Sequence, residues 1–202
     1  NLIVFLSQSF SNVYSSENLE FDKVSLPNLF QELLNKTLKP STSLEELRHW
    51  AREFEIDFSD TDDWNDLFFR IYIDKIESEI GKYGPTLVFD FPPQQSSLAR
   101  INDRGWADRF ELYWKGIEIA NAYNELNSPE ANEKVFSKEL QLRQDKGSLT
   151  SKRDESFFKS LRQGMPPSAG IALGLDRLFM IFNGKDSIHS LQVKPSDILN
   201  EP

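Results

Sequence analysis

The sequence predicts one α+β domain in which β-strands are bracketed by helices. Segments with apolar residues at helical spacing dominate the first 80 residues, whereas short runs rich in β-branched and aromatic residues follow. The 202 residues, 39% of them hydrophobic, suffice for one sizeable core, and no internal repeat or low-complexity tract divides them. We therefore expect a single domain over residues 1–202.

The first part of the chain is predicted to hold one strand and three helices. The apolar segment 2–10 is typical of a strand that leads into a polar loop. A first helix is expected near Pro27, and a serine and a glutamate at 43–46 fit a capping box that begins a second. A third helix is expected over 62–80, because its first turn is acidic and Gly81 stands where a helix C′ glycine is common.

Strands and helices alternate in the second part of the chain. Residues 86–91 are β-prone and end at two prolines, which cannot extend a hydrogen-bonded ladder. Two more β-prone runs, 109–114 and 117–123, are separated by a lysine and a glycine and therefore predict an antiparallel hairpin. The remaining expected elements are helices at 129–144 and 154–162, and a strand at 170–175 that runs directly into a final helix.

Charge and composition exclude several classes of function. Because 32 acidic residues outnumber 23 basic ones, the net charge is −9, and direct nucleic-acid binding is not expected. The longest aliphatic or aromatic run spans only residues 2–6, whereas a membrane span needs about 20 residues. With no cysteine and only His49 and His189, a metal would have to be held by carboxylates, which favours magnesium. The start at Asn1 has no signal-peptide pattern, so we expect a cytoplasmic protein.

The most informative stretch is GMPPSAGIALGLDRL, residues 164–178. Its glycines at 170 and 174 would let a flat ligand lie against a strand that has almost no side-chain bulk. Arg177, at the start of the following helix, offers a fixed fork for phosphate where the helix dipole also favours negative charge. A tightly packed core strand followed by a surface arginine would give the same pattern.

This stretch resembles motif 3 of the class II aminoacyl-tRNA synthetases, in particular the lysyl-tRNA synthetase group, where a G-x-G-x-D-R strand and helix bind ATP. Residues 87–99 (LVFDFPPQQSSLA) and 109–126 (RFELYWKGIEIANAYNEL) are similar to the same group at matching spacings. Ala172, which the resemblance assigns to the amino-acid pocket, stands where the tRNA-charging enzymes usually carry glycine. This variant is similar to the shortened paralogues that attach β-lysine to elongation factor P. The resemblance implies a class II synthetase-like antiparallel sheet flanked by helices, with Arg177 as a catalytic, ATP-binding residue and Gly174 beside the nucleotide.

Glu111 and Glu118 are predicted to share one face of the hairpin. If Lys115 and Gly116 form a two-residue turn, Glu118 lies opposite Tyr113 and on the side of Glu111. Two acids on one face repel each other unless water screens them or a cation bridges them. A solvated hairpin face and a magnesium site both fit this pair. The resemblance implies the magnesium site, with both glutamates as ligands beside ATP.

Three residues lie an odd number of positions after Glu118, namely Asn121, Tyr123 and Glu125. Side chains alternate between the two faces of a regular strand, so these three would point to the face opposite Glu118. The resemblance nevertheless implies that these three residues line the amino-acid pocket, with Glu125 facing the side-chain ammonium of the substrate. Both placements hold only if the strand is interrupted. We therefore expect a bulge or twist near Ala120 or Asn121, because bulges are common beside active sites.

The sequence departs from the family in the stretch that would form motif 2. Overlaying residues 9–27 on the family's F-R-x-E and H-N-P-E-F pattern places Ser11 at the arginine position and Val13 at the glutamate position. Ser25 and Pro27 take the positions of a later glutamate and tyrosine. Removing one preorganised donor of this kind typically costs about 10²–10³ in rate. Motif 1 and an anticodon-binding barrel have no counterpart, so the domain is expected to be incomplete on its N-terminal side.

Three functions remain open from the sequence. The first is an ATP-dependent, AMP-forming ligase that adenylates lysine or β-lysine with ATP and Mg²⁺ and passes it to a protein acceptor such as elongation factor P. The second is a catalytically impaired paralogue that binds a nucleotide or a translation factor, which Ser11 and Val13 favour. The third is an acidic scaffold without a ligand. A homodimer is also left open, although the motif 1 interface that the family uses for dimers is missing.

Overall fold

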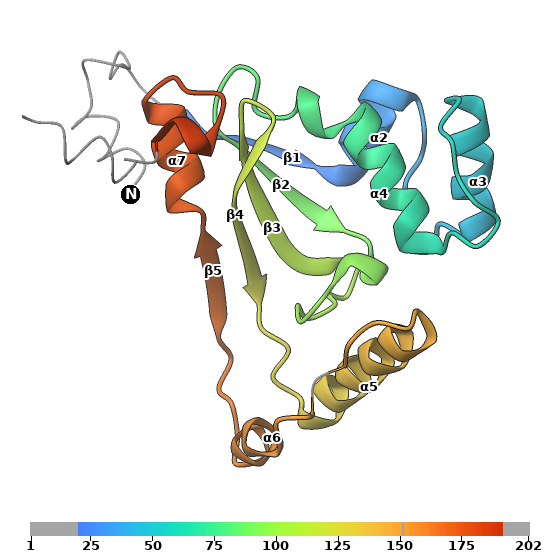
Figure 1. Cartoon of the computed structure of the whole chain (residues 1–202), viewed down its shortest axis with the longest axis vertical. Helices are drawn as coiled ribbons and strands as arrows, with labels where there is room; N and C mark the ends of the chain where they lie inside the picture. Colours follow the sequence, from blue (N-terminus) through green and yellow to red (C-terminus); the bar gives the residue numbers. More distant parts are fainter. Residues whose placement is uncertain (1–19, 151, 192–202) are drawn as a thin grey trace, which may run out of the picture.

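A five-stranded sheet forms the centre of the computed structural model, which describes residues 20–150 and 152–191 (Figure 1). In spatial order the strands are β1 (Asp22–Ser25), β2 (Thr86–Phe91), β3 (Ala107–Trp114), β4 (Ile117–Asn124) and β5 (Ala169–Leu173). Neighbouring strands are antiparallel except β1 and β2, which pair in parallel. Helices flank this sheet, so the predicted α+β class is confirmed. The strand predicted at 2–10 lies outside the described residues.

Capping groups determine where several of the helices begin. The helices of the described residues are α2 (Leu26–Leu34), α3 (Leu44–Glu53), α4 (Trp64–Lys75), α5 (Pro129–Asp145), α6 (Glu155–Arg162) and α7 (Leu175–Phe182). The hydroxyl of Ser43 accepts the N–H of Glu46 at 3.2 Å, and the carboxylate of Glu46 accepts the N–H of Ser43 at 2.7 Å. This is the predicted capping box, and Asp63 and Asp66 form another at the start of α4.

The helix predicted over 62–80 is shorter than expected. It ends at Lys75, and a 3₁₀ turn follows at Glu77–Glu79. Gly81 is therefore not the C′ residue of α4, but it directly follows Ile80, the C-cap of the 3₁₀ turn, as the predicted helix end at residue 80 requires. Its φ is +72°, and a Cβ there would lie 2.8 Å from the Cα of Trp114, so the glycine allows the turn to approach the β3–β4 hairpin backbone.

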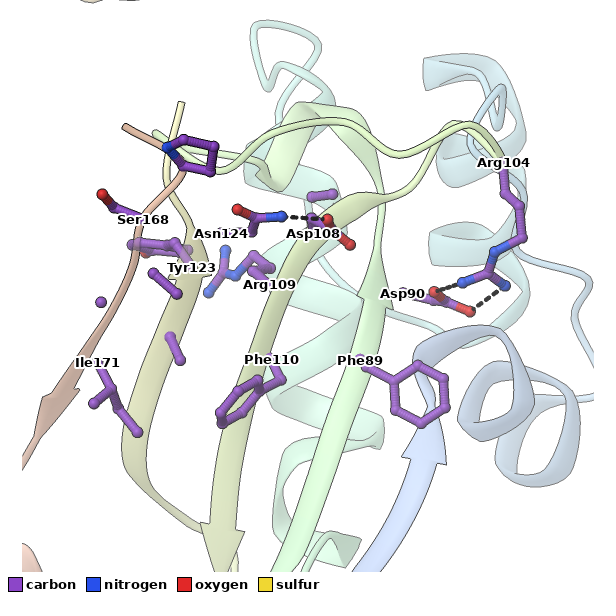
Figure 2. Close-up of a pocket in the computed structure, with 15 residues that line it drawn as sticks. Phe89, Asp90, Arg104, Asp108, Arg109, Phe110, Tyr123, Asn124, Ser168 and Ile171 are labelled. Carbon is purple, nitrogen blue, oxygen red and sulfur yellow. Dashed lines mark hydrogen bonds and ion pairs between the residues drawn. The ribbon is translucent and has the colours of Figure 1, made fainter. Parts of the chain in front are cut away.

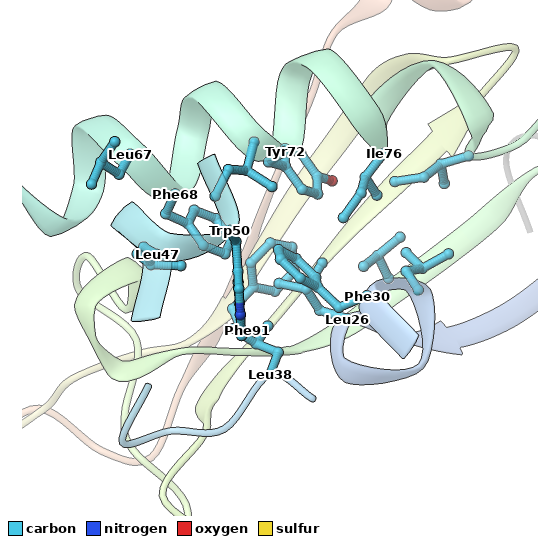
Figure 3. Packing of buried hydrophobic residues seen from close by; sticks show 14 of the residues in the cluster. Leu26, Phe30, Leu38, Leu47, Trp50, Leu67, Phe68, Tyr72, Ile76 and Phe91 are labelled. Carbon is cyan, nitrogen blue, oxygen red and sulfur yellow. The ribbon is translucent and has the colours of Figure 1, made fainter. Parts of the chain in front are cut away.

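Buried apolar residues lie on both faces of the sheet. Helices α2 and α4 cover one face over β1 to β3, and α3 packs against α4 on the outside. Phe30 and Phe68 of these helices pack in the same cluster as Val88 of β2 (Figure 3). Helix α7 covers part of the other face, where Leu178 packs with Leu112. Strand β5 forms an edge of the sheet, next to β4.

The hairpin between β3 and β4 has the predicted two-residue turn. Lys115 and Gly116 have φ values of +54° and +72°, as a tight hairpin turn with two left-handed residues requires. Glu118 pairs with Tyr113, as expected from that turn. The turn therefore sets the register in which the site residues of both strands meet.

Helices α5 and α6 pack against each other near the far ends of β4 and β5 (Figure 1). The ring of Phe136 on α5 lies 5.3 Å from that of Phe158 on α6, centroid to centroid. Asp154 caps α6 by accepting the N–H groups of Ser156 and Phe157. This pair of helices connects β4 to β5, which lies beside the hairpin.

Candidate functional site

A β-bulge in β4 brings the two predicted sets of residues to one face of the sheet. Residues 112–113 of β3 pair with Ala120 and Glu118, so Ile119 is an extra residue in β4. Ile119 and Ala120 both belong to the cluster under α7. The strand alternation therefore shifts by one residue, and Glu118 shares the face of Asn121. The predicted bulge is confirmed, at a position adjacent to Ala120.

Helix α4 covers part of the face on which the predicted residues gather. This face carries Glu111 on β3, Glu118, Asn121 and Tyr123 on β4, and Gly170 and Ala172 on β5. Asn121 pairs with both Glu111 and Ala172, and Tyr123 pairs with Gly170. Cross-strand partners are close neighbours, so these three strands present the residues in adjacent rows.

Glu111 lies in a buried network of donors. Its residue is 7% exposed, and one carboxylate oxygen accepts from the Arg109 guanidinium and from the Asn121 amide at 3.2 Å. The other oxygen accepts the hydroxyl of Tyr113 at 2.8 Å. Burial raises the pKa of Glu111 above its ordinary value, while Arg109 and the Tyr113 hydroxyl oppose this rise. Because Glu111 is buried, the alternative that it belongs to a solvated hairpin face is excluded.

Arg177 approaches the acidic residues from the start of α7. Its Nη1 donates to the backbone carbonyl of Glu118 at 2.8 Å and lies 3.7 Å from a carboxylate oxygen of the same residue. Gly174 caps this helix and donates its N–H to the carbonyl of Ile119, which ties the helix start to the bulge. Burial is the main cause that raises the pKa of Glu77, and the negative charge of Glu118 raises it further. The positive charge of Arg177 opposes this rise.

Two cavities share Glu77 and Glu118. One of about 100 Å³ lies between α4 and the sheet and also contains Glu111. The other, of about 500 Å³, contains Arg177 but not Glu111. The resemblance implies that the two acids and Arg177 surround one bound nucleotide. In the structure Glu118 lines two cavities, one of which also contains Glu111 and the other Arg177.

Gly170 leaves the space that the Glu125 carboxylate occupies. A Cβ at position 170 would lie 2.6 Å from Oε1 of Glu125, closer than carbon and oxygen approach without displacement. This carboxylate therefore lies over β5 beside Tyr123, the strand partner of Gly170. Ala172 is exposed on the same strand and pairs with Asn121. The residues that the resemblance assigns to an amino-acid pocket are thus neighbours.

The predicted motif 2 positions are only partly described. Ser11 and Val13 lie outside the described residues. The hydroxyl of Ser25 accepts the N–H of Asn28 at 3.3 Å and caps α2, while Pro27 lies in the first turn of that helix. Ser25 and Pro27 therefore contribute a helix start, and neither offers a carboxylate or a phenol.

Arg109 is a residue of this face that the sequence reasoning missed. Its side chain is 8% exposed, and Nη1 donates to the carbonyl of Gln95 at 2.6 Å. Its guanidinium carbon lies 4.4 Å from the ring centroid of Phe91 and 5.4 Å from that of Tyr123. The available signal was its position two residues before Glu111, because such residues share a face of a strand.

A separate hollow of about 820 Å³ lies over the opposite face of the sheet (Figure 2). Its floor includes a row of cross-strand neighbours, Phe89, Phe110, Ala122 and Ile171. At one end Arg104 donates two hydrogen bonds to Asp90, and Asn124 donates one to Asp108 at 2.9 Å. Arg109, Tyr123 and Gly170 also line this hollow, whereas the predicted acids and Arg177 do not.

The acidic residues of this face suit a magnesium ion that binds together with a nucleotide. They suit a metal ion held by the protein alone less well. Residues 20–150 and 152–191 contain no group of three or more His, Cys, Asp or Glu able to hold a metal ion. Magnesium is usually held by one or two carboxylates together with substrate phosphates. Glu118, whose side chain is 33% exposed, can offer an oxygen directly. Glu111 lines the same small cavity and accepts three protein donors, which leaves about one of its roughly four lone-pair sites, on the oxygen that accepts from Tyr113.

Fold and site together are those of an α+β domain whose antiparallel strands present acids, an amide and an arginine at one face. The family model of class II tRNA synthetases (D, K and N) matches residues 5–197. The chain belongs to this family.

Individual relatives are similar over most of the chain. An elongation factor P–(R)-β-lysine ligase from Buchnera aphidicola is 37% identical over 180 residues, which are 87% of this chain and 55% of that protein. The enzyme of the same name from Histophilus somni is 37% identical over 150 residues, 73% of this chain and 46% of its own length. A homologue of that ligase from Aquifex aeolicus is 35% identical over 172 residues, 85% of this chain and 55% of its own length. The chain spans about half the length of the curated relatives it matches.

None of the helices in the described part of the chain combines the length and the apolar character that a membrane span requires.

Proposed function

We propose that the chain binds ATP with magnesium and a lysine-like amino acid, and that it activates the amino acid for transfer to a protein acceptor. The observation that carries this proposal is the bulge at Ile119, because it brings Glu118 to the face of Glu111, Asn121 and Tyr123. Membership of the class II family supports the use of ATP. A cytoplasmic location follows from these proposed partners.

The nucleotide is proposed to bind at the end of the face where α7 begins. Arg177 would bind the triphosphate, since its guanidinium is half exposed and lies at a helix start beside Glu118. Glu118 and Glu111 would hold the magnesium ion, which when bound neutralises phosphate charge. Gly174 would let the nucleotide approach the backbone, because the glycine has no side chain beside Arg177.

The amino acid is proposed to bind at the other end of the face. The carboxylate of Glu125 would pair with the side-chain ammonium of the substrate. The Oδ1 atom of Asn121 is buried without a hydrogen-bond partner, so it would accept an N–H of the ligand. Tyr123 and Ala172 would complete the walls of the pocket. An unpaired buried acceptor costs about 1–3 kcal/mol, which a bound amino group would recover.

The proposed reaction has two steps. A carboxylate oxygen of the amino acid attacks the α-phosphorus of ATP, and pyrophosphate leaves with the electrons of the broken P–O bond. An amine of the acceptor then attacks the carbonyl carbon, releases AMP and loses a proton. Arg177 would stabilise charge that develops on the phosphates. The names of the relatives indicate (R)-β-lysine as the amino acid and elongation factor P as the acceptor.

A binding module without turnover is the second candidate. The observation that favours it is the role of Ser25 and Pro27, which form the start of α2 where the family pattern has a glutamate and a tyrosine. A protein that keeps Glu111, Glu118 and Arg177 but lacks the charged groups of motif 2 would still bind a nucleotide.

Calorimetry and ATP–pyrophosphate exchange distinguish the two candidates. We expect ATP to bind in the presence of magnesium, and labelled pyrophosphate to enter ATP when lysine or (R)-β-lysine is added. Replacing Glu118 by Gln should weaken magnesium-dependent ATP binding about tenfold or more. Glu79→Gln is the matched control, because this exposed acid pairs with Lys82. Binding without exchange would favour the binding module, and no binding of ATP would refute both candidates.

A further inference from the structure

We propose that Arg109 is a positioning residue that holds the carboxylate of Glu111 in the orientation needed for magnesium–ATP. This inference rests on the proposed function. Arg109 and Glu111 lie two residues apart on β3, with side chains 8% and 9% exposed, and form an ion pair. Arg109 is not proposed to touch the nucleotide or the amino acid.

The guanidinium of Arg109 is itself held from several sides. The carbonyl of Gln95, in the turn after β2, accepts from Nη1 at 2.6 Å. The rings of Phe91 and Tyr123 lie 4.4 and 5.4 Å from the guanidinium carbon, as in cation–π contacts. Three elements therefore restrict its position before it meets Glu111. A planar group fixed in this way loses little freedom when it donates a hydrogen bond.

Three donors from two strands orient the Glu111 carboxylate. Arg109 and the Asn121 amide donate to one oxygen, and Tyr113 donates to the other. Of these donors, Arg109 alone has a positive charge, which a buried carboxylate needs to remain ionised. Arg109 also contacts Tyr123, which the proposed function assigns to the amino-acid pocket. It therefore connects the two halves of the proposed site.

A structural role alone is a weak explanation for this pair. Replacing a buried ion pair by apolar residues is often neutral or stabilising, so the pair is a poor source of folding stability. The side chain also keeps a buried Nε without a hydrogen-bond partner. An arginine that served only to fill the core would be better replaced by an apolar side chain.

Titration calorimetry of ATP with and without magnesium tests the inference. We expect magnesium to increase the ATP affinity of the wild-type protein. In Arg109→Met the ATP affinity measured with magnesium should be at least tenfold lower than in the wild type, while the affinity measured without magnesium stays unchanged. Glu111→Gln should lose as much, and the double variant should lose no more than either single one. Arg109→Lys should retain part of the increase, because lysine keeps the charge but lacks the planar fork.

Arg104→Met is the matched control. Like Arg109, Arg104 pairs with a carboxylate, to which it donates two hydrogen bonds, but neither Arg104 nor its partner Asp90 lines the cavities that contain Glu111, Glu118 and Arg177. We expect its magnesium-dependent affinity to equal that of the wild type. Circular dichroism and thermal unfolding of every variant verify the fold, and Arg109→Lys decides the question if Arg109→Met does not fold.

The outcomes separate this inference from the proposed function. If the wild-type protein shows no magnesium-dependent binding of ATP, the proposed function and the inference both fail. If Glu111→Gln loses the effect of magnesium while both Arg109 variants keep it in full, only the inference is overturned. It is also overturned if the losses of Arg109→Met and Glu111→Gln add independently in the double variant.

Discussion

Replacing Gly170 by alanine should separate ligand binding from folding. The added Cβ would lie 2.6 Å from Oε1 of Glu125, whereas ordinary contacts begin at 3.4 Å, so the carboxylate must move by roughly 0.8 Å. The displaced atom is the end of a flexible side chain. Gly170 is also free of a positive φ, so alanine meets no backbone strain there.

The expected magnitudes differ for stability and for affinity. We expect the free energy of unfolding to change by less than about 1 kcal/mol, as is usual away from cores and special backbone conformations. Binding of lysine or (R)-β-lysine should weaken much more, because hydrogen bonds to charged groups contribute about 1.5–3 kcal/mol. At about 1.4 kcal/mol per factor of ten, the affinity should fall roughly 10- to 100-fold.

Gly81→Ala is a control with the opposite expectation. Its added Cβ would meet backbone atoms of Tyr113 and Trp114 at 2.8 Å, and these atoms cannot rotate away. Its φ of +72° adds strain for any residue with a Cβ. We expect a loss of about 2–5 kcal/mol in unfolding free energy, from the left-handed conformation and from overpacking.

Urea denaturation of both variants, together with calorimetric titration of the amino acid in the presence of a non-hydrolysable ATP analogue, tests these expectations. ATP binding by Gly170→Ala should equal that of the wild type. If Gly170→Ala binds the amino acid as tightly as the wild type, Glu125 does not recognise the ammonium. If it is destabilised as much as Gly81→Ala, the carboxylate is not the flexible neighbour that the geometry indicates.

Three further predictions concern single residues. Glu125→Gln should weaken lysine binding about tenfold or more without changing ATP affinity, and equal losses for both ligands in calorimetry would contradict its assignment to the ammonium. Ser43→Ala removes the N-cap of α3 and should lower the unfolding free energy in urea by about 1 kcal/mol, while an unchanged midpoint would mean that the capping box contributes nothing. Because burial raises the pKa of Glu111 above its ordinary value of 4.5, the contribution of this carboxyl to stability is fully present below pH 4.5 and is lost as pH rises through the folded pKa. The stability difference between wild type and Glu111→Gln should therefore fall over that window, and a difference that rises with pH would refute the sign.

Interactions between residues close in the chain could be predicted from the sequence. The capping box at Ser43, the turn at Lys115 and Gly116, and the end of β2 before two prolines all depend on neighbours within a few positions. The bulge was also predictable, although only because the resemblance demanded that residues of opposite parity share a face. Such features follow from backbone geometry and local hydrogen bonding, which nearby side chains determine.

Features that depend on distant partners were not predictable. The end of α4 at Lys75 follows from the approach of the next turn, with Gly81, to the β3–β4 hairpin. The role of Arg109 depends on Gln95 and Phe91 arriving from another strand and its turn.

By itself, therefore, the sequence determined most of the elements, the turn that sets the hairpin register and the chemical groups of the candidate site, but it did not predict strand β1 or the end of α4 at Lys75. Only the tertiary structure decided that Glu111 is buried beside Arg109, that Glu125 lies over Gly170, and that two cavities meet at Glu118. The physical reason is that burial, close contacts and cavities arise where segments far apart in the chain pack together, and no local pattern specifies those distances.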